Sequence, residues 1–323
     1  MIPEVSKEPS SLLIKRKGGR ILTLEYDNPS TLAVVAYEMS RRSIGPKLYG
    51  LFKGGSVEEF IDSHTLTNEE CLDPDIYHDI AISFAQIHSI KGVPIAVNIS
   101  NGINWWVKEN MKKIPSKRDL WYNHENIKKF NLDLNYMFEF DFIEEFDHII
   151  ETCDKVKMRK CFILQDRNRN NCLVRNKVEP GQSRIVQIDY DGCIYLYRGI
   201  DIGTYFLYQT FADDREKGLV STNDPQYYDN KLKRKFLKIY QDEIKRLNIW
   251  NDFDEDEIDS IDNLLLESNI GACYTILLIV SYIIVSAENI LEHDPKFASA
   301  LPYMLKQYES IKKEISNQIG KKE

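Results

Sequence analysis

The sequence predicts an α+β protein with two lobes: a small antiparallel β lobe with one helix at residues 1–64, and a large, mostly helical lobe at residues 65–323. Three observations predict this division. Apolar residues alternate around glycine turns before residue 64, whereas they recur at helical spacing after it. Two apolar runs that end in aspartate interrupt the helical pattern between residues 160 and 190. A chain of 323 residues is long enough for two lobes that share a cleft.

The small lobe is expected to contain a hairpin, a helix and a second hairpin. SLLIKRKGGRILTLEY, residues 11–26, has apolar stretches on both sides of a Gly-Gly pair, and glycines supply the positive φ of a tight turn. STLAVVAYEMSRRS, residues 30–43, has apolar residues at helical spacing, with Ser30 as a candidate N-cap. GPKLYGLFKGGSVEEFI, residues 45–61, indicates two strands around another Gly-Gly turn.

The large lobe is expected to consist mainly of helices, at residues 74–90, 140–156, 230–247, 257–267, 271–291 and 302–315. The acidic stretch NDFDEDEIDSID, residues 251–262, is predicted to be a solvated loop and helix start. Residues 110–140 are mixed in charge and aromatic. We interpret them as a surface insertion with partly buried rings, and a dimer or partner surface is the alternative.

Composition and charge exclude several classes of function. The formal net charge of −8 argues against broad binding to a nucleic-acid backbone, which needs a basic face, although a local basic pocket for a nucleotide remains compatible with it. The six cysteines form no Cys-x-x-Cys pair and the six histidines form no metal-binding motif. We therefore expect reduced, buried thiols in a cytoplasmic protein, without a transition-metal site.

Two stretches bear on targeting and on the membrane. The N-terminal MIPEVSKEPSS has no apolar core, so it does not resemble a signal peptide. GACYTILLIVSYIIVSA, residues 271–287, is about as long as the shortest membrane-spanning helices. It contains Ser281 and Ser286 and runs directly into Glu288, so we expect a buried helix and no membrane span.

Three polar residues stand at the ends of apolar runs. Asp166 and Asn171 lie in CFILQDRNRNNCLV, residues 161–174, and Asp189 lies in RIVQIDYDG, residues 184–192. Two carboxylates and one amide suit phosphoryl transfer, because hard oxygen donors are the ligands that Mg²⁺ requires. The alternative is that they are ordinary turn residues, since Asp and Asn commonly end strands.

Four stretches, in order and at matching spacing, resemble the choline/ethanolamine kinase family: SIGPKLYGLFKGGSVEEFI, IAISFAQIHSI, LQDRNRNNCL and RIVQIDYDGCIYLYRGIDIGTYF. The resemblance covers roughly residues 11–310. It implies a two-lobed protein-kinase-like fold. It also implies Mg²⁺-dependent transfer of the γ-phosphoryl group of ATP to the hydroxyl of a small amino alcohol, as in phospholipid head-group synthesis.

The resemblance assigns roles to individual residues. It implies Asp166 as the base that receives the acceptor's proton, and Asn171 and Asp189 as Mg²⁺ ligands. Adenine would hydrogen-bond to hinge backbone near Glu59 and Ile61.

The resemblance also covers three residues near the acceptor and the loop. Asp191 keeps an acidic group on the acceptor side. We interpret His88 as a structural histidine, and Asp201 as a brace of the loop with Arg198 as its ion-pair partner.

The sequence departs from the family at the loop and at the nucleotide phosphates. The loop histidine of the family is Leu164 here, so a hydrogen-bonding brace of the loop is lost. The Gly-rich phosphate turn aligns with KEPSS, residues 7–11, and a basic and an acidic residue of the family align with Leu24 and Leu32. Joint loss of both ends of an ion pair avoids leaving one buried charge alone.

A substitute charge for the phosphates is available near the first hairpin. Lys15, Lys17 or Arg20 is the candidate, although a hairpin tip is the simpler reason for basic residues at these positions.

The amine pocket also departs from the family. Two tryptophans of a late helix align with Ile279 and Tyr282, and Tyr274 and Tyr303 are candidates for further aromatic contacts with a cation. Tyrosines on an apolar helix more often belong to the core. A family glutamate is also missing from YFLYQ, residues 205–209.

Two functions follow. The first is an ATP- and Mg²⁺-dependent kinase for a small amino alcohol, with a homodimer as an option for its assembly. The second is a catalytically weak or inactive relative that keeps the fold for binding.

Overall fold

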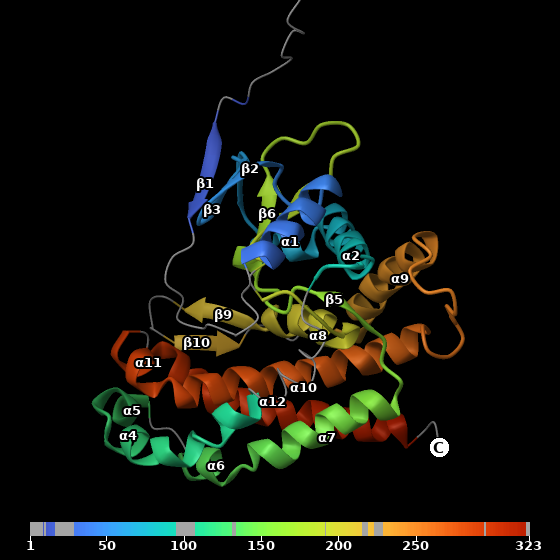
Figure 1. Cartoon of the computed structure of the whole chain (residues 1–323). Coiled ribbons are helices and arrows are strands. Elements are labelled where there is room, and N and C mark those ends of the chain that lie inside the picture. Colours follow the sequence, from blue (N-terminus) through green and yellow to red (C-terminus); the bar gives the residue numbers. More distant parts are fainter. Residues whose placement is uncertain are drawn as a thin grey trace, which may run out of the picture.

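The structure is a computed structural model of the whole chain. It describes residues 9, 11–16, 29–94, 107–130, 134–190, 192–214, 219–222, 229–293 and 295–320. A small three-stranded sheet and one helix lie at one end of the molecule, and a larger, mostly helical body lies at the other (Figure 1). The predicted combination of small antiparallel sheets with a mostly helical body is confirmed.

The strands and helices below are those within the described residues. The strands are β1 (Leu12–Arg16), β2 (Leu48–Phe52), β3 (Gly55–Glu59), β4 (Ser63–Thr65), β5 (Lys160–Ile163), β6 (Cys172–Arg175), β7 (Ile185–Gln187), β8 (Ile194–Tyr197), β9 (Phe211–Asp214) and β10 (Leu219–Thr222). The helices are α1 (Pro29–Arg41), α2 (Pro74–His88), α4 (Arg118–Asn123), α5 (Glu125–Phe130), α6 (Leu134–Glu139), α7 (Phe142–Lys155), α8 (Arg198–Tyr208), α9 (Asn230–Arg246), α10 (Ile261–Val285), α11 (Ala287–His293) and α12 (Lys296–Ile319). Three short 3₁₀ turns are η1 (Glu70–Leu72), η2 (Ile114–Lys117) and η3 (Arg169–Asn171).

The small sheet has the strand order β1-β3-β2, and both pairings are antiparallel. The predicted second hairpin is confirmed: β2 and β3 meet at Gly54, whose φ of 92° favours glycine. Gly55 faces the carbonyl oxygen of Lys15 on β1 so closely that a Cβ atom would overlap it. The first strand of the predicted hairpin at residues 11–26 is β1, and the second lies outside the described residues.

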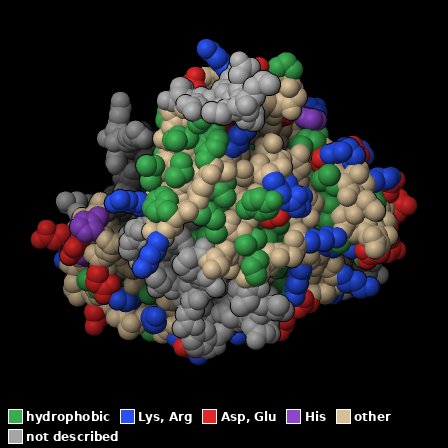
Figure 2. All heavy atoms as spheres, turned by 45° about the horizontal axis from the view of Figure 1, so that its top comes forward, with side chains coloured by type: hydrophobic (Ala, Val, Ile, Leu, Met, Phe, Trp, Pro, Cys, Tyr) green, Lys and Arg blue, Asp and Glu red, His purple; other side chains and the backbone are tan. Residues whose placement is uncertain are grey.

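The small sheet contributes little to the hydrophobic core. Figure 2 brings the top of Figure 1 forward and shows hydrophobic side chains at this surface. Those of the sheet that are at least 41% exposed are Leu12, Leu13, Ile14, Tyr49, Leu51 and Phe52. Backbone pairing, rather than a shared core, therefore holds these strands together.

Helix α1 is confirmed, but its first residue differs from the prediction. It begins at Pro29, so Ser30 lies inside the first turn and not at the N-cap. Val35 and Met39 turn into the core, and Ser40 accepts a hydrogen bond from the backbone of Leu48 at 2.8 Å. Helix and small sheet are thereby tied together.

The two aspartate-ended runs, which interrupt the helical pattern of the sequence, form strands β5 and β7. β5 pairs antiparallel with β8, and β6 lies between β4 and β7 in a second antiparallel sheet. Cys161, Phe162 and Ile163 of β5 and all three residues of β7 are buried. Each polar candidate therefore emerges where a buried strand reaches the surface.

The late helices differ from the prediction at one boundary. We expected helices at 257–267 and 271–291, but α10 is continuous from Ile261 to Val285 and ends at Ser286. Gly271 does not break it. Its missing side chain lets the carbonyl of Gly199 in α8 approach, and a Cβ atom there would overlap that oxygen.

Helix α10 is the central helix of the large lobe (Figure 1). It is long and apolar enough to cross a membrane, yet 78% of its apolar window is buried inside the protein. It packs against α7, α8 and α12. This confirms the expected buried helix, because neighbouring helices supply its apolar surroundings.

The acidic stretch before α10 is not fully solvated, which corrects the prediction. Asp259 has no exposed surface and accepts hydrogen bonds from Arg198 at 2.5 Å and from Arg159 at 2.8 Å. Arg198 also donates to Glu267 of α10 at 2.6 Å. Burial by itself would raise the pKa of Asp259, and the two arginines outweigh it and lower that pKa. Two arginines and two carboxylates thus join α8, α10 and the residue before β5.

Residues 107–130 and 134–140 form short helices on the large lobe. Trp121 is fully buried and donates through its indole nitrogen to the carbonyl of Ile284 at 3.1 Å. Tyr122 and Phe138 are partly buried, and the centroids of their rings lie 6.1 Å apart. The described part of this region is therefore fixed to α10 through a buried tryptophan.

All six cysteines are unpaired and buried, as expected. Burial raises the pKa of Cys71 and of Cys172 to about 12. The thiols are therefore protonated at neutral pH and act as small apolar core groups.

We expect Gly271→Ala to destabilise the protein by about 1–3 kcal/mol or more, because the new methyl group would push α8 from α10. Urea unfolding measures the change. Gly50→Ala is the matched control, since a Cβ atom at Gly50 meets nothing within 4 Å and β2 tolerates alanine there. Equal stability of Gly271→Ala and wild type would contradict this account of the α8–α10 contact.

Candidate active site

Asp166 lies on the loop between β5 and β6, immediately after an unusual backbone conformation. Gln165 has a φ of 67°, in the left-handed region that residues with a side chain seldom adopt. The amide of Asp166 donates to the carbonyl of Leu164 at 2.8 Å. This tight bend turns the chain out of the buried strand and leaves the Asp166 carboxylate exposed.

Asp166 and Asn171 contact each other directly. Asn171 donates through its side-chain nitrogen to Oδ2 of Asp166 at 3.1 Å. Asn168 donates to the other oxygen, Oδ1, at 2.9 Å. Both amides belong to the same short loop, so the loop itself orients the carboxylate.

Asp189 lies next to this pair through the backbone. The amide of Ile188 donates to the carbonyl of Asn171 at 3.0 Å, and Asp189 follows with a φ of 58° and an exposed side chain. Gly192 completes the approach, because a Cβ atom on it would meet the carbonyl of Leu164 at 3.3 Å. The structure therefore brings Asp166, Asn171 and the backbone of Asp189 to one place, whereas Asp191 lies outside the described residues.

The donor atoms of this cluster suit Mg²⁺. Asp166 and Asp189 offer exposed carboxylates, and the amide nitrogen of Asn171 is used by Asp166, which leaves the amide oxygen to face a cation. Hard oxygen atoms on two adjoining loops are the ligands that Mg²⁺ takes, together with water and phosphate oxygens.

Asp201 of α8 holds the loop that carries Asp166 in place, as the sequence predicts. Its Oδ1 accepts from the amide of Gln165 at 2.9 Å. Its Oδ2 accepts from Nε of Arg167 at 2.8 Å and from His88 of α2 at 3.2 Å. The prediction that Arg198 pairs with Asp201 is wrong, because Arg198 forms its ion pairs with Asp259 and Glu267.

His88 is buried and structural, as the sequence predicts. Its Nδ1 lies 2.7 Å from the hydroxyl of Tyr240 and its Nε2 faces Asp201. Burial lowers the pKa of His88, although the neighbouring carboxylate of Asp201 opposes this. Burial alone would raise the pKa of Asp201, but the charge of Arg167 and the hydrogen bonds from His88 and Arg167 hold it at about 2.

The predicted nucleotide residues lie at the junction of the two parts. The amide of Glu59 donates to the carbonyl of Lys47 at 2.8 Å, and its carboxylate faces Arg175 of β6 at 3.4 Å. The carbonyl of Ile61 accepts from the hydroxyl of Ser63 at 3.1 Å. Lys15 is exposed on β1, opposite Ser56 of β3, whereas Lys17 lies outside the described residues.

The three predicted pocket tyrosines have different surroundings. Tyr274 is fully buried, with its ring 5.3 Å from that of Phe146 in α7, which favours a core role. Tyr282 of α10 is partly buried and Tyr303 of α12 is 38% exposed. Among the ring contacts of the described residues, none joins these tyrosines to one another.

Two residues near Asp166 were not identified from the sequence. Burial, together with the nearby carboxylate of Asp166, raises the pKa of Tyr208 at the end of α8. Arg167, directly after Asp166, is 4% exposed and pairs with Asp201. The sequence held one signal for each residue. Tyr208 stands in YFLYQ where the family has its glutamate. Arg167 closely follows a buried strand, and a charged residue at such a position seldom lacks a partner.

We expect Asp201→Asn to lower stability more at pH 6 than at pH 2. The folded-state pKa of about 2 lies below the ordinary value of 3.8, so the carboxylate stabilises the fold above about pH 4, and this contribution is lost as the pH falls toward 2. The pH-dependent part of the difference from wild type should be about 2 kcal/mol, measured by urea unfolding at several pH values.

The control for this titration is Asp262→Asn. Asp262 pairs with Arg234 on the surface, where 72% of its side chain is exposed, so its difference from wild type should stay small at every pH. A constant difference between wild type and Asp201→Asn from pH 6 to pH 2 would contradict the role of the Asp201 charge.

Comparisons with solved structures identify the fold. A choline kinase from Cryptosporidium parvum Iowa II superimposes with a TM-score of 0.65 at 19% identity, covering 95% of this chain and 83% of that one. The choline kinase LicA from Streptococcus pneumoniae gives 0.55 at 15% identity, with 93% and 86% covered. An aminoglycoside phosphotransferase from Alicyclobacillus acidocaldarius gives 0.53 at 10% identity, with 96% and 86% covered. These likenesses confirm the predicted protein-kinase-like fold.

Sequence comparisons identify the family. Mouse "Choline kinase alpha" is 27% identical over 239 residues, which are 72% of this chain and 49% of that protein. Human "Choline/ethanolamine kinase" is 24% identical over 205 residues, 64% of this chain and 48% of that protein. The chain thus spans about half the length of the curated relatives it matches. The family model described as Choline/ethanolamine kinase matches residues 18–309, so the chain belongs to the choline/ethanolamine kinase family.

Proposed function

We propose that this protein transfers the γ-phosphoryl group of ATP to the hydroxyl of a small amino alcohol, with Mg²⁺, in phospholipid head-group synthesis in the cytoplasm. The observation that carries the proposal is the contact of Asp166 with Asn171, beside Asp189. A base and hard oxygen ligands within one loop cluster are what phosphoryl transfer requires of a protein.

Asp166 is proposed to receive the proton of the acceptor hydroxyl. Its two oxygens are oriented by Asn168 and Asn171, and its exposed side chain leaves room for an acceptor. Asn171 and Asp189 would hold Mg²⁺, which neutralises charge on the phosphates when bound. The hydrogen bond between Ile188 and Asn171 supports this division, because it keeps the two ligand loops in register.

The nucleotide is proposed to lie between the small sheet and the catalytic loop, with adenine against hinge backbone near Glu59 and Ile61. Two anchors support this placement. Asn176 donates to Asp62 at 2.6 Å, and Arg175 faces Glu59, so the hinge is tied to β6 of the large lobe. Lys15 and Lys17 remain the candidates for a charge near the phosphates. A solved LicA structure contains AMP, which is compatible with nucleotide binding by this fold.

The acceptor is proposed to be smaller or less cationic than choline. Tyr282 is the aromatic candidate that the surroundings favour, because Tyr274 is enclosed by the core. One or two accessible rings provide less cation–π stabilisation than a complete aromatic cage. Asp191 and Tyr303 remain candidates for further contacts with the amine.

A catalytically weak relative that acts by binding is the second candidate function. It is favoured by Leu32, which lies partly buried on α1 where the family has an acidic partner for its phosphate-binding residue. The aligned Leu24 lies outside the described residues. Without that ion pair, ATP would bind more weakly by roughly 1.5–3 kcal/mol, about tenfold to hundredfold.

We expect Asp189→Ala to abolish Mg²⁺-dependent nucleotide binding, whereas Asp166→Ala should keep binding and lose turnover. The metal bridges the phosphates, but the base acts only on the acceptor hydroxyl. Thermal shift with ATP, with and without Mg²⁺, measures binding, because a ligand that binds the native state raises its apparent stability. A coupled assay measures turnover.

Asp256→Ala is the matched control, because Asp256 is an exposed carboxylate on the loop between α9 and α10. It should leave binding and turnover unchanged. Equal ATP shifts in wild type and Asp189→Ala, in both the presence and the absence of Mg²⁺, would refute the metal assignment.

We expect slow turnover with choline and faster turnover with ethanolamine. Each lost cation–π contact costs about 0.5–2 kcal/mol of affinity for a quaternary amine. Steady-state assays with choline, with ethanolamine and without acceptor test this order. Choline turnover at about 1–100 per second, an ordinary rate for kinases, would show that the phosphate contacts are made by residues such as Lys15 or Lys17.

A further inference from the structure

The loop that carries Asp166 lacks the histidine that the family has at its start. Leu164 occupies that position, and it is 1% exposed within the main hydrophobic core. An aliphatic side chain cannot hydrogen-bond, so it cannot orient the loop. The strained backbone at Gln165, with a φ of 67°, nevertheless persists, and such a conformation requires surrounding contacts that hold it.

Arg167 supplies such contacts on the other side of Asp166. Its Nε donates to Oδ2 of Asp201 at 2.8 Å, and its Nη2 reaches the same oxygen. Its guanidinium lies 3.8 Å from the ring centroid of Phe84 in α2. A cation paired with a carboxylate and stacked on an aromatic face has little freedom to move.

The same carboxylate holds both neighbours of Asp166. Oδ1 of Asp201 accepts from the amide of Gln165, and Oδ2 accepts from Arg167. Asp166 is therefore fixed at the residue before it and at the residue after it. His88 and Tyr240 extend the network to α2 and α9, which are rigid helices of the large lobe.

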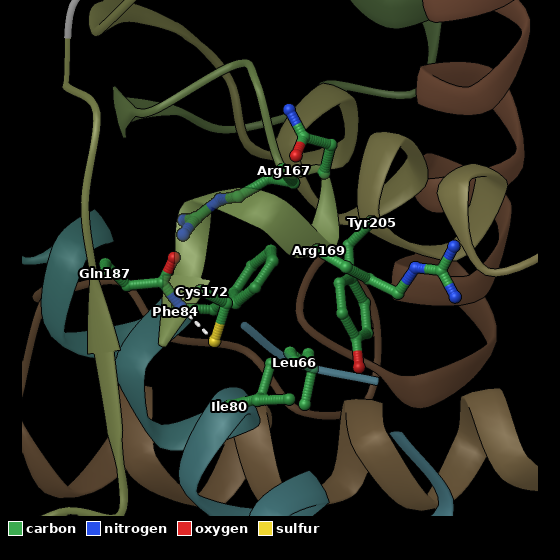
Figure 3. Close-up of a pocket in the computed structure, with 9 residues that line it drawn as sticks. Leu66, Ile80, Phe84, Arg167, Arg169, Cys172, Gln187 and Tyr205 are labelled. Atoms are coloured by element: carbon green, nitrogen blue, oxygen red, sulfur yellow. Dashed lines mark hydrogen bonds between the residues drawn. The ribbon is translucent and has the colours of Figure 1, made fainter. Parts of the chain in front are cut away.

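The third guanidinium nitrogen of Arg167, Nη1, takes no part in the contacts with Asp201. Nη1 is buried and has no hydrogen-bond partner among the residues that the structure describes, and Arg167 lines a cavity of about 10 Å³, close to the size of one water molecule (Figure 3). Gln187 lines the same cavity two residues before Asp189, and its amide donates to Cys172 at 3.6 Å. One enclosed water in this cavity would connect the two loops.

We propose that Arg167 is a positioning residue that performs the task of the missing loop histidine: it fixes the catalytic loop, and with it Asp166, to Asp201. Arg167 acts through Asp201 and the backbone, and it does not contact the substrates. Its effect on turnover rests on the proposed kinase function, whereas its effect on the loop does not.

Hydrogen exchange of the loop tests the brace without any need for activity. In Arg167→Gln, the peptide spanning residues 162–172 should exchange about tenfold faster or more, because the Gln165 amide loses its fixed acceptor geometry. Peptides of α10 and α12 should exchange as in wild type. Arg169→Gln is the matched control, since Arg169 lines the same cavity but its guanidinium points away from that of Arg167 (Figure 3).

Steady-state kinetics of the same variants test the link to catalysis. In Arg167→Gln, kcat should fall about tenfold to hundredfold, because small displacements of a catalytic group cost that much, while KM for ATP stays within about threefold. Arg167→Lys, which keeps the charge but not the planar fork, should recover part of both losses. A residue that only stabilised the fold would lower the midpoint of thermal unfolding and leave kcat unchanged.

Wild-type exchange of residues 162–172 in Arg167→Gln would overturn the proposal, and so would wild-type kcat with faster exchange. If Arg167→Gln does not fold, Arg167→Lys takes its place, and wild-type exchange in that variant overturns the proposal. If the wild type has no turnover with any amino alcohol, the kinase function fails, and the exchange measurement alone decides whether Arg167 braces the loop.

Discussion

A single carboxylate, that of Asp201, must be satisfied inside the protein for the rest of the site to exist. A buried and unpaired carboxylate costs several kcal/mol, so the chain has to surround it with donors. The donors come from three places in the sequence: His88, the backbone of Gln165, and Arg167. Helix α2, the loop after β5 and helix α8 are therefore required to meet at one point, and the exposed end of that loop carries Asp166.

Local pattern was sufficient for most of the fold. Periodic apolar residues correctly indicated α2, α7 and α9, and Gly54 with Gly55 correctly marked the turn between β2 and β3. Pattern failed where tertiary contact overrides local preference. We expected two separate helices at 257–267 and 271–291, but α10 is continuous, and the close approach of α8 makes Gly271 a packing residue inside it.

Within the candidate site, the places of the three polar residues in the chain were easier to predict than the contacts that support them. Asp166 and Asp189 follow apolar runs and Asn171 precedes one, so their positions follow from strand boundaries. Arg198 lies three residues from Asp201 in the sequence, yet it pairs with Asp259 and Glu267, which lie 61 and 69 residues away. Arg167 pairs with Asp201 instead. Ion pairs between residues so far apart in the sequence depend on how the helices pack, which no local pattern contains. For the same reason, the prediction that Asp259 is solvated was wrong.

Because its six thiols are buried, the native protein should not react with alkylating reagents. A reagent needs a thiol that is both accessible and deprotonated. Every cysteine is buried, and the pKa of Cys71 and of Cys172 is about 12, so neither condition is met in the native protein. The cysteines are distributed over β5, β6, α7, α10 and two other segments, so each samples a different part of the core. The alkylation rate of each cysteine therefore reports how often its own region of the core opens. Mass spectrometry measures these rates without any introduced label.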